Sequence, residues 1–581
     1  MGDGADSVFT NGKVVTVDNR FSLCEAIAVA GDRIAAVGSN EEVLCFAGPR
    51  TKRVDLQGRT VIPGLIDAHP HIDTWKGFYP SLAGCTSIAE VVERVAAAVA
   101  KAGTGKWILF QKFAEPDSKA PGNFKEKRFP NRHDLDRVSP NNPVWLRGGY
   151  LTPGVLNSAA LEIAGITRDT PQPRQLVPVH DWRTRDMVAS PGGYIEKDPE
   201  TGEPTGVLMD GNDILSRTVT SSFYEHVPQL GYSEYVANIE ARSLDFSRMG
   251  ITGIYEGHGL IDPAERNARA FLDVRARDKL TVRAQIMTNI PTVGTPQDVV
   301  ERIAALPHVA HHGAGDDFLR FVGVSVTLDG ACGCLDAVQP KLPGWMGKRW
   351  GAIRDGIARV PEEKYRALVR EAARRGMRVA TKADGEGMIE QVIRIYGEAD
   401  RETGIRDRRF IMMHSAFTHP EKQMPRLKEL GVVPTTCISF LWNHGMNMMR
   451  AYGEELIHRA VPFKSWLDAG IPVTNGTDTY PWNPFLSLWA MITRTDGETG
   501  KQLGTKECVS REEALRIYTA NGAYLMQMEN RLGTLETGKY ADLLVLSDDY
   551  LGVDVEKIKD IKPLMTMVGG RVVYSAPEFA A

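Results

Sequence analysis

The stretch Val61-Ile62-Pro63-Gly64-Leu65-Ile66-Asp67-Ala68-His69-Pro70-His71 decides how the rest of the chain is interpreted. An apolar run from Val61 to Ile66 ends in two histidines that are one residue apart. If this run is a strand, residues two apart project from the same face, so His69 and His71 point the same way. Two imidazoles so placed can bind one metal ion. The alternative is a pair of surface histidines in a turn, but candidate partners far downstream favour a metal site.

The middle of the chain alternates short apolar runs with helical patterns. Helices are predicted over 88–99, 232–249, 361–376 and 421–430, and strands over 107–110, 251–255, 377–381, 410–414, 432–438 and 471–476. Alternation of this kind is typical of a parallel sheet whose strands are connected by helices. In a chain of 581 residues, it predicts an α/β fold built on a (β/α)8 TIM-type barrel.

The two ends of the chain differ from the middle, because they carry short strands and turns. We predict that residues 1–62 and 531–581 form one composite β-sandwich, and that residues 63–530 form the barrel. Pro and Gly are dense over about 115–230, which indicates an inserted α+β region.

Composition narrows the functional classes. The hydrophobic content is 43%, the charged content is 24% and the net charge is −4, so no nucleic-acid or membrane partner is expected. The seven cysteines are scattered and odd in number, which favours a reducing, cytoplasmic location over a disulfide framework. The N-terminus has no apolar signal segment, and no apolar run is long enough to span a membrane.

In a barrel enzyme the catalytic groups lie where the strands end. The polar residues that directly follow the apolar runs are His69, His71, Glu256, His258, Asp329, Lys382, Asp384, His414, Trp442, His444 and Asp478. His69, His71 and Asp478 are the donor types that hold a divalent ion with one open position for water. Asp478 is then the candidate to move a proton from that water to a leaving group, and His414 is a ligand or a polarising group. Taken singly, Asp478 is also compatible with a helix cap, His414 with a core histidine, and Glu256 and His258 with a solvated loop.

The chain resembles the amidohydrolase superfamily of metal-dependent hydrolases. The resemblance rests on residues 63–71, on two N-terminal segments (11–17 and 31–34), and on the return segment 533–542. Segments 157–161, 202–208 and 518–521 are similar to the branch of YtcJ-like and N-substituted-formamide-deformylase-like enzymes, amidohydrolase family 3. The resemblance implies the barrel with its composite sandwich, and hydrolysis of carbon–nitrogen bonds other than peptide bonds.

The metal site departs from that branch at three places. Ser325 stands where the branch usually carries a lysine that bridges two ions, and Ala380 stands where it usually carries a histidine. A histidine that is common between positions 148 and 156 is also missing. We therefore predict one divalent ion, zinc before manganese or iron, held by His69 and His71 with Asp478, His414 or Glu256. Lys382 is a candidate ligand or base, although pairing with Asp384 or Glu386 is the simpler interpretation.

Aromatic and thioether side chains crowd the predicted rim, so a small apolar or aromatic substrate is expected. The candidate contacts are Trp75, Trp442, His444 and Arg147. The leading hypothesis is hydrolysis of an amide-like bond by metal-activated water. A metal-dependent lyase, decarboxylase or isomerase is the alternative, and a binding protein that kept only the scaffold is a third. The sequence is also compatible with a homodimer.

Overall fold

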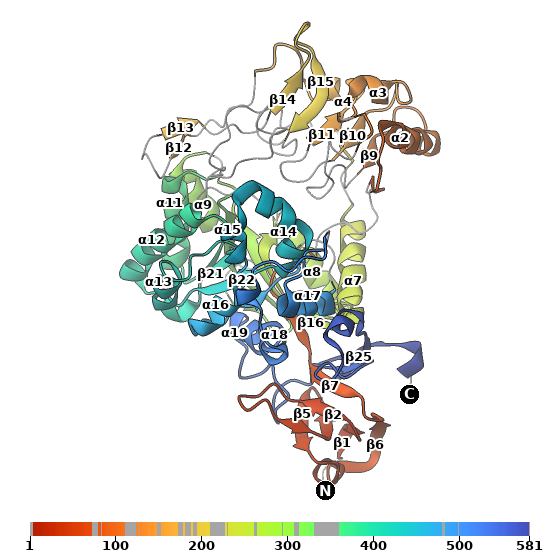
Figure 1. Cartoon of the computed structure of the whole chain (residues 1–581), viewed down its shortest axis with the longest axis vertical. Coiled ribbons are helices and arrows are strands. Elements are labelled where there is room, and N and C mark those ends of the chain that lie inside the picture. The colour runs from red at the N-terminus through yellow and green to blue at the C-terminus, as the bar shows by residue number, and fades with distance from the viewer. Residues whose placement is uncertain are drawn as a thin grey trace. The chain divides into compact units, whose positions relative to one another are not determined.

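The computed structural model of the chain contains two compact units (Figure 1). The first comprises residues 1–74, 232–329 and 362–581, and the second comprises residues 75–231 and 330–361. The structure describes residues 4–72, 80–82, 84–110, 124–126, 128–147, 153–171, 178–180, 187–189, 194–209, 227–228, 231–260, 264–292, 294–306, 313–329, 360–478, 483–497 and 499–579.

The first unit is built on a ring of eight parallel strands. In order around the ring they are β8 (Leu65–Asp67), β16 (Ile251–Leu260), β17 (Arg283–Asn289), β19 (Leu319–Thr327), β20 (Arg378–Ala383), β21 (Ile411–His414), β22 (Val433–Thr436) and β23 (Thr474–Asn475). The short β18 (Ala314–Gly315) adds to β19 in antiparallel fashion. The Ala68 N–H donates to the Asn475 carbonyl at 3.0 Å, and the Asp478 N–H donates to the His69 carbonyl at 2.9 Å. These bonds join the first strand to the last, so the predicted (β/α)8 barrel is confirmed.

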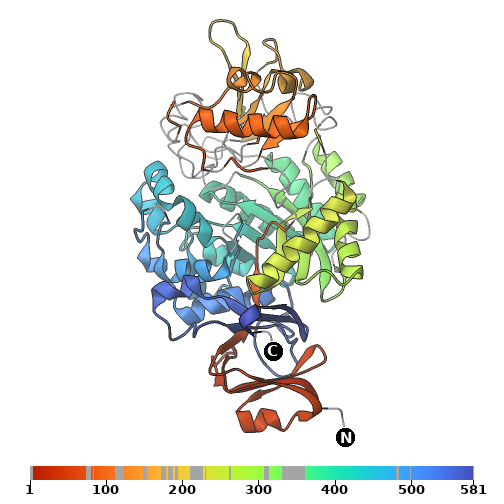
Figure 2. The same ribbon diagram turned by 90° about the vertical axis from the view of Figure 1, so that its right-hand side faces the viewer.

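Helices surround the ring of strands (Figures 1 and 2). They are α7 (Tyr232–Arg248), α8 (Ala264–Ala276), α9 (Pro296–Ala304), α11 (Glu362–Arg374), α12 (Glu386–Thr403), α13 (Met424–Glu429), α14 (Ile438–Tyr452), α15 (Glu454–His458), α16 (Phe463–Asp468), α17 (Pro484–Thr493), α18 (Arg511–Tyr518) and α19 (Ala520–Leu525), with 3-10 turns η3 (Arg406–Arg408), η4 (Thr505–Glu507) and η5 (Val555–Asp560). α11 illustrates why these segments form helices. Its residues Tyr365, Leu368 and Ala372 recur at helical spacing and lie on one buried face. It ends before Gly376, whose φ of +75° suits a residue without a side chain.

The amino end of the barrel is closed by the segment that follows α19. The Gln285 side chain donates to the Met526 carbonyl at 2.7 Å, and Arg378 donates to the Leu525 carbonyl at 2.9 Å. Both side chains are buried. Since this end is filled and the Met413 and Val433 side chains pack inside the ring, polar groups at the carboxyl ends of the strands are left to form a site.

The first unit has two further sheets, one built from N-terminal strands alone and one that combines strands from both ends of the chain. One has the order β5 (Arg33–Gly38), β4 (Ala26–Ala30), β1 (Ala5–Thr10), β6 (Ala47–Asp55), with α1 (Asn40–Leu44) beside it. The other has the order β26 (Arg571–Ser575), β25 (Pro563–Val568), β24 (Leu543–Leu546), β7 (Thr60–Pro63), β2 (Lys13–Val15), β3 (Leu23–Cys24), and η6 (Pro577–Phe579) follows it. Phe9, Val61 and Leu543 share one buried core. Figure 2 shows the red N-terminal strands beside the blue C-terminal strands.

The second unit has its own five-stranded sheet. Its order is β14 (Tyr194–Lys197), β15 (Pro204–Met209), β11 (Pro153–Leu156), β10 (Val144–Leu146), β9 (Ile108–Phe110), and a hairpin joins β12 (Pro178–His180) and β13 (Met187–Ala189). Its helices are α2 (Ile88–Ala102), α3 (Arg132–Asp136) and α4 (Ser158–Ile163). The helix and strand predicted over 88–99 and 107–110 thus belong to this unit and not to the barrel, because hydrophobic periodicity does not say which sheet a strand joins.

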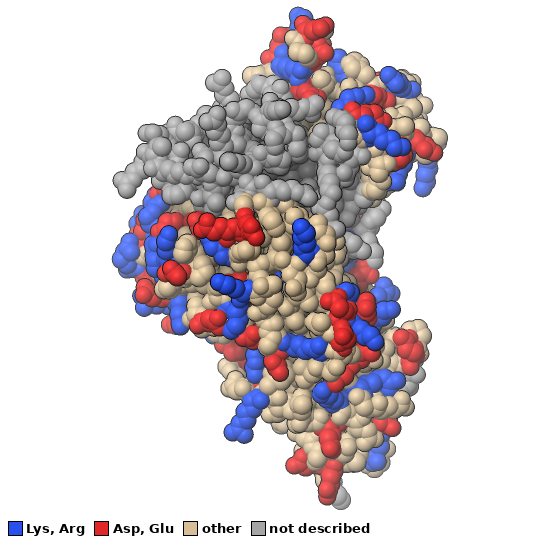
Figure 3. Space-filling model, in the orientation of Figure 1, with Lys and Arg blue, Asp and Glu red and all other residues tan. Residues whose placement is uncertain are grey.

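Basic and acidic side chains are interspersed over the described surface that Figure 3 shows. Many of them pair between neighbouring helices, as Arg366 does with Glu398 at 2.7 Å and Arg394 with Glu362 at 2.6 Å. Within the described part of the chain, none of the helices combines the length and the hydropathy that a membrane span requires.

Replacing Gly476 with alanine is expected to destabilise the protein. A Cβ at this position would meet the Cβ of His69 and would lie 2.9 Å from the His69 backbone nitrogen. Overpacking of this kind costs about 1–3 kcal/mol, so the midpoint of thermal unfolding at a fixed scan rate should fall. In the control Gly397→Ala, within α12, the nearest atom to a new Cβ is 3.7 Å away. Helix propensity then favours alanine by about 1 kcal/mol, and equal midpoints for both variants would contradict the packing argument.

Candidate metal centre

The carboxylate of Asp67, the last residue of β8, links the first strand of the barrel to the segment that follows the last strand. One carboxylate oxygen accepts the N–H groups of His69, at 3.0 Å, and Thr477, at 3.1 Å, while the other accepts the Thr477 hydroxyl at 2.5 Å. Asp67 is fully buried, and this burial raises its pKa to about 6. Asp67 is not among the candidate residues predicted from the sequence, although its place between the apolar run and His69 is a usable signal. Its role is to position the residues that follow β8 and β23.

Three side chains from three strand ends meet in the barrel mouth. The His69 Nε2 lies 3.3 Å from the His414 Nε2 and 3.8 Å from the Asp478 Oδ1. The His414 Nε2 lies 3.9 Å from the Asp478 Oδ2. One donor atom from each residue lies within 4.8 Å of the other two, and all three residues are buried. β8, β21 and β23, which are far apart in the sequence, therefore build one compact group of two nitrogens and one oxygen.

The backbone is unusual at two of these three residues. His414 has φ of 68° and Asp478 has φ of 53°, and Ser415 follows with φ of 46°. The left-handed region is costly for residues with a side chain and persists where the surrounding structure enforces it. Here it turns each side chain inward at the point where its strand ends.

The hydrogen bonds around His414 fix which of its nitrogens faces the group. The His414 Nδ1 lies 3.1 Å from the Asp384 Oδ2, so Nδ1–H donates to this carboxylate and Nε2 carries the lone pair. The His69 Nδ1 is buried and has no hydrogen-bond partner within the described residues. Two nitrogens bound to one tetrahedral ion at 2.0–2.1 Å would lie about 3.3–3.4 Å apart. The observed 3.3 Å between the two Nε2 atoms fits a divalent ion.

The protonation states also fit a cation. Burial lowers the pKa of His69 and of His414 well below 6.5, and the neighbouring His414 and Lys382 charges act in the same direction. Burial acts to raise the pKa of Asp478, but the hydrogen bond from His71 and the electrostatic influence of the nearby imidazoles outweigh it, so that pKa lies well below 3.8. Neutral imidazoles and an ionised carboxylate are the forms that bind metal ions.

His71 and Glu256 lie beside this group. The His71 Nε2 is 2.9 Å from the Asp478 Oδ1, and the His71 ring lies 5.3 Å from the His69 ring. Glu256 is buried on β16, in a strand and not in a solvated loop, and its Oε2 accepts the Ile72 N–H at 3.2 Å. It thereby holds the segment that carries both histidines, and its role as a ligand stays a prediction.

Lys382 is buried near the end of β20, and its positive charge bears on His69, His414 and Asp384. Burial raises the pKa of Asp384 to about 7, although the Lys382 charge acts to lower it. Glu386, the other suggested partner of Lys382, pairs with Arg459 at 2.5 Å.

A second buried carboxylate supports the loop that carries Asp384. Asp329 accepts the Asp384 N–H at 3.0 Å and the Gly385 N–H at 2.8 Å. Burial and the Asp384 charge raise its pKa well above 3.8. Asp329 therefore acts on the metal centre through the backbone that presents Asp384 to His414.

Four substrate contacts were predicted, and the structure describes two of their side chains. Trp75 and the side chain of His444 lie outside the described residues. Arg147 belongs to the second unit, where its guanidinium lies 4.8 Å from the Trp145 ring. Trp442 is on α14, two residues after Phe440, whose ring lies 4.8 Å from that of His414. Because two residues turn an α-helix by about 200°, Trp442 faces away from the metal centre.

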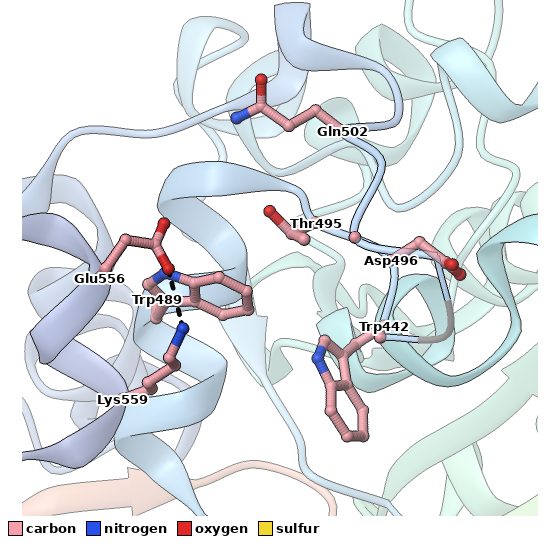
Figure 4. Close-up of a pocket in the computed structure, with 9 residues that line it drawn as sticks. Trp442, Trp489, Thr495, Asp496, Gln502, Glu556 and Lys559 are labelled. Atoms are coloured by element: carbon pink, nitrogen blue, oxygen red, sulfur yellow. Dashed lines mark hydrogen bonds and ion pairs between the residues drawn. The ribbon is translucent and has the colours of Figure 1, made fainter.

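Trp442 instead borders a separate pocket of about 670 Å³ (Figure 4). The other lining residues are Trp489, Thr495, Asp496, Gly497, Gly500, Gln502, Glu556 and Lys559. The Lys559 Nζ lies 4.3 Å from the centre of the Trp489 ring and is paired with Glu556 at 2.8 Å. The role of Trp442 in binding a substrate stays a prediction.

A parallel-stranded barrel with two histidines and an aspartate at its mouth defines a metal-dependent hydrolase of the barrel type. Comparison with protein families agrees, since the amidohydrolase family matches residues 52–574. The chain belongs to this family and is an enzyme that acts on carbon–nitrogen bonds other than peptide bonds.

Several known proteins are similar over nearly the whole chain. N-substituted formamide deformylase of Arthrobacter pascens is 28% identical over 98% of both chains, and putative amidohydrolase YtcJ of Bacillus subtilis (strain 168) is 23% identical over 98% of this chain and 99% of its own. An uncharacterized metal-dependent hydrolase from Pyrococcus horikoshii has the same fold, with a TM-score of 0.69 and 19% identity, covering 95% of this chain and 99% of its own.

Replacing Asp384 with asparagine is expected to weaken metal binding about 10–100-fold, because the neutral amide no longer anchors the His414 Nδ1–H as a carboxylate does. The dissociation constant would be measured by competition with a chromogenic chelator on the full chain. Glu390→Gln is the matched control, since Glu390 is an exposed carboxylate that pairs only with Arg426 among the ion pairs described. Equal affinities for the two variants would show that Asp384 does not support the site.

Proposed function

We propose that the protein hydrolyses an amide-like carbon–nitrogen bond of a small apolar or aromatic molecule. One divalent ion, zinc before manganese or iron, would be held by His69, His414 and Asp478, with His71 as a further donor. The single observation that carries this proposal is the meeting of two neutral imidazole nitrogens and an ionised carboxylate within 4.8 Å in a buried mouth. The free cysteines of the described residues support a reducing, cytoplasmic location.

When bound, such an ion activates water as a nucleophile near neutral pH and polarises the carbonyl that is attacked. Asp478 is ionised and accepts a hydrogen bond from His71, so it is oriented to take a proton and to deliver it to the leaving nitrogen. Lys382 supplies a buried positive charge on the neighbouring β20, suited to stabilise negative charge that develops on the substrate oxygen. Phe440 covers one side of His414 and keeps water from it.

The name of one similar protein supports the class of bond, and the crystal structure of another supports zinc as the ion. N-substituted formamide deformylase matches over the full length of both chains. The atrazine chlorohydrolase TrzN of Arthrobacter aurescens TC1, which shares the fold with a TM-score of 0.51 at 15% identity, was crystallised with zinc. The apolar preference of the substrate rests on the aromatic residues expected at the rim and is proposed on that ground alone.

A lyase, decarboxylase or isomerase on the same scaffold is the second candidate. It is favoured by Ser325 and Ala380, both buried, at positions where the branch usually supplies ligands. It is also favoured by Lys382, whose amine at the rim is suited to proton transfer.

Reaction in ¹⁸O-labelled water separates the two candidates. With a panel of N-acyl arylamines that includes formanilide, hydrolysis places one ¹⁸O atom in the released acid, whereas a lyase or isomerase turns over without it. Asp478→Asn should lower kcat/KM about 100–10,000-fold, because the base is lost, and Glu390→Gln should not. Turnover without label would reject hydrolysis.

The purified full chain is expected to hold one divalent ion per chain. Elemental analysis after dialysis against metal-free buffer measures this number, and removal by chelator followed by readdition should abolish and restore turnover. His69→Ala should lose the ion, because it removes one of the three closely spaced donors found among the described residues. Two ions per chain, or none, would contradict the proposed site.

A further inference from the structure

The end of β16 carries a bulge directly beside the metal centre. Glu256 is paired with Ile286 of β17, and Leu260 is paired with Thr288. Four steps along β16 thus correspond to two steps along β17, so Gly257, His258 and Gly259 contain two extra residues. Bulges next to active sites commonly redirect a side chain.

Glycine stands on both sides of His258. Gly259 has φ of +83°, and a Cβ there would lie 2.6 Å from the Ser325 Oγ and 2.8 Å from the Asn289 backbone nitrogen, so glycine is required at this position. A Cβ on Gly257 would lie 2.6 Å from the Met413 sulfur. The bulge therefore packs closely against β17, β19 and β21.

Ser325 holds the bulge from β19. Its Oγ donates to the His258 carbonyl at 2.7 Å, and the Asn289 side chain donates to the same carbonyl at 3.2 Å. Ser325 is fully buried. Ser325, which stands in place of a bridging lysine, thus fixes the backbone of His258.

The imidazoles near the metal centre differ in their exposure to solvent. The side chains of His69 and His414 are each 1% exposed, those of Asp478 and His71 are 12% and 17% exposed, and His258 is half-buried. The His258 ring lies 5.1 Å from the His71 ring. His71 and His258 are therefore the more exposed of these imidazoles, and their rings lie next to each other.

We propose that His258 is a substrate-contacting residue and that Ser325 is its positioning residue. This inference rests on the proposed function for the identity of the substrate. Among the described residues, the one group of three donors within 4.8 Å does not include His258, so its imidazole is left to bind substrate. An imidazole offers one N–H and one lone pair, which match the carbonyl and the N–H of an amide.

The test uses the metal-loaded full chain with formanilide as probe, and the variants His258→Ala and Ser325→Ala. His258→Ala should raise KM about tenfold and leave kcat and the metal dissociation constant within threefold. Diethyl pyrocarbonate should label His258 in the parent protein, formanilide should protect it, and Ser325→Ala should change the labelling rate at least threefold. Thr566→Val is the matched control, because it removes another buried hydroxyl–carbonyl bond of 2.7 Å, far along the chain in β25.

A metal affinity that falls tenfold or more in His258→Ala would make His258 a ligand and overturn the proposal. An unchanged KM, or the absence of protection by formanilide, would overturn the substrate contact. Labelling in Ser325→Ala that matches Thr566→Val would overturn the positioning role. Failure of the proposed hydrolysis is distinct, since it would appear as no turnover by the parent protein, while the labelling rates would still report on Ser325.

Discussion

The seam between β8 and β23 is the constraint on which the rest of the site depends. The buried carboxylate of Asp67 accepts hydrogen bonds from both sides of this seam, and the His69 carbonyl accepts the Asp478 N–H across it. Gly476 allows the two backbones to come this close. Without closure, the first histidine and the last aspartate would belong to opposite edges of an open sheet, and no shared donor group would exist.

Burial then determines the protonation states of the side chains near this seam. Desolvation keeps the imidazoles of His69 and His414 neutral, whereas Asp478 stays ionised because hydrogen bonding and nearby imidazoles outweigh its desolvation. His414 is held by the Asp384 carboxylate behind it. A cation is the simplest group that satisfies two inward lone pairs and a negative charge in so small a volume.

The departures at Ser325 and Ala380 are part of the packing of the barrel. Ser325 lies opposite Ala380 in the register of β19 and β20, and both residues are buried. The hydroxyl of Ser325 anchors the bulge of β16 through the His258 carbonyl. The residue at the position of the bridging lysine therefore links β19 to the segment that carries His258.

The sequence alone predicted the barrel, because strand periodicity is a local property of the chain, and it indicated the family through motifs such as residues 63–71. It also placed His69, His414 and Asp478 among the candidate donors, because each of them follows an apolar run. Only the tertiary structure decided that His414 and not His71 lies closest to His69, that Asp67 fastens the seam, and that α2 and β9 belong to the second unit. Strand register and barrel closure determine the distances between strand ends, the side of the helix that Trp442 occupies, and the bulge that carries His258. Register and closure act between segments hundreds of residues apart, so they leave no periodic pattern in the sequence.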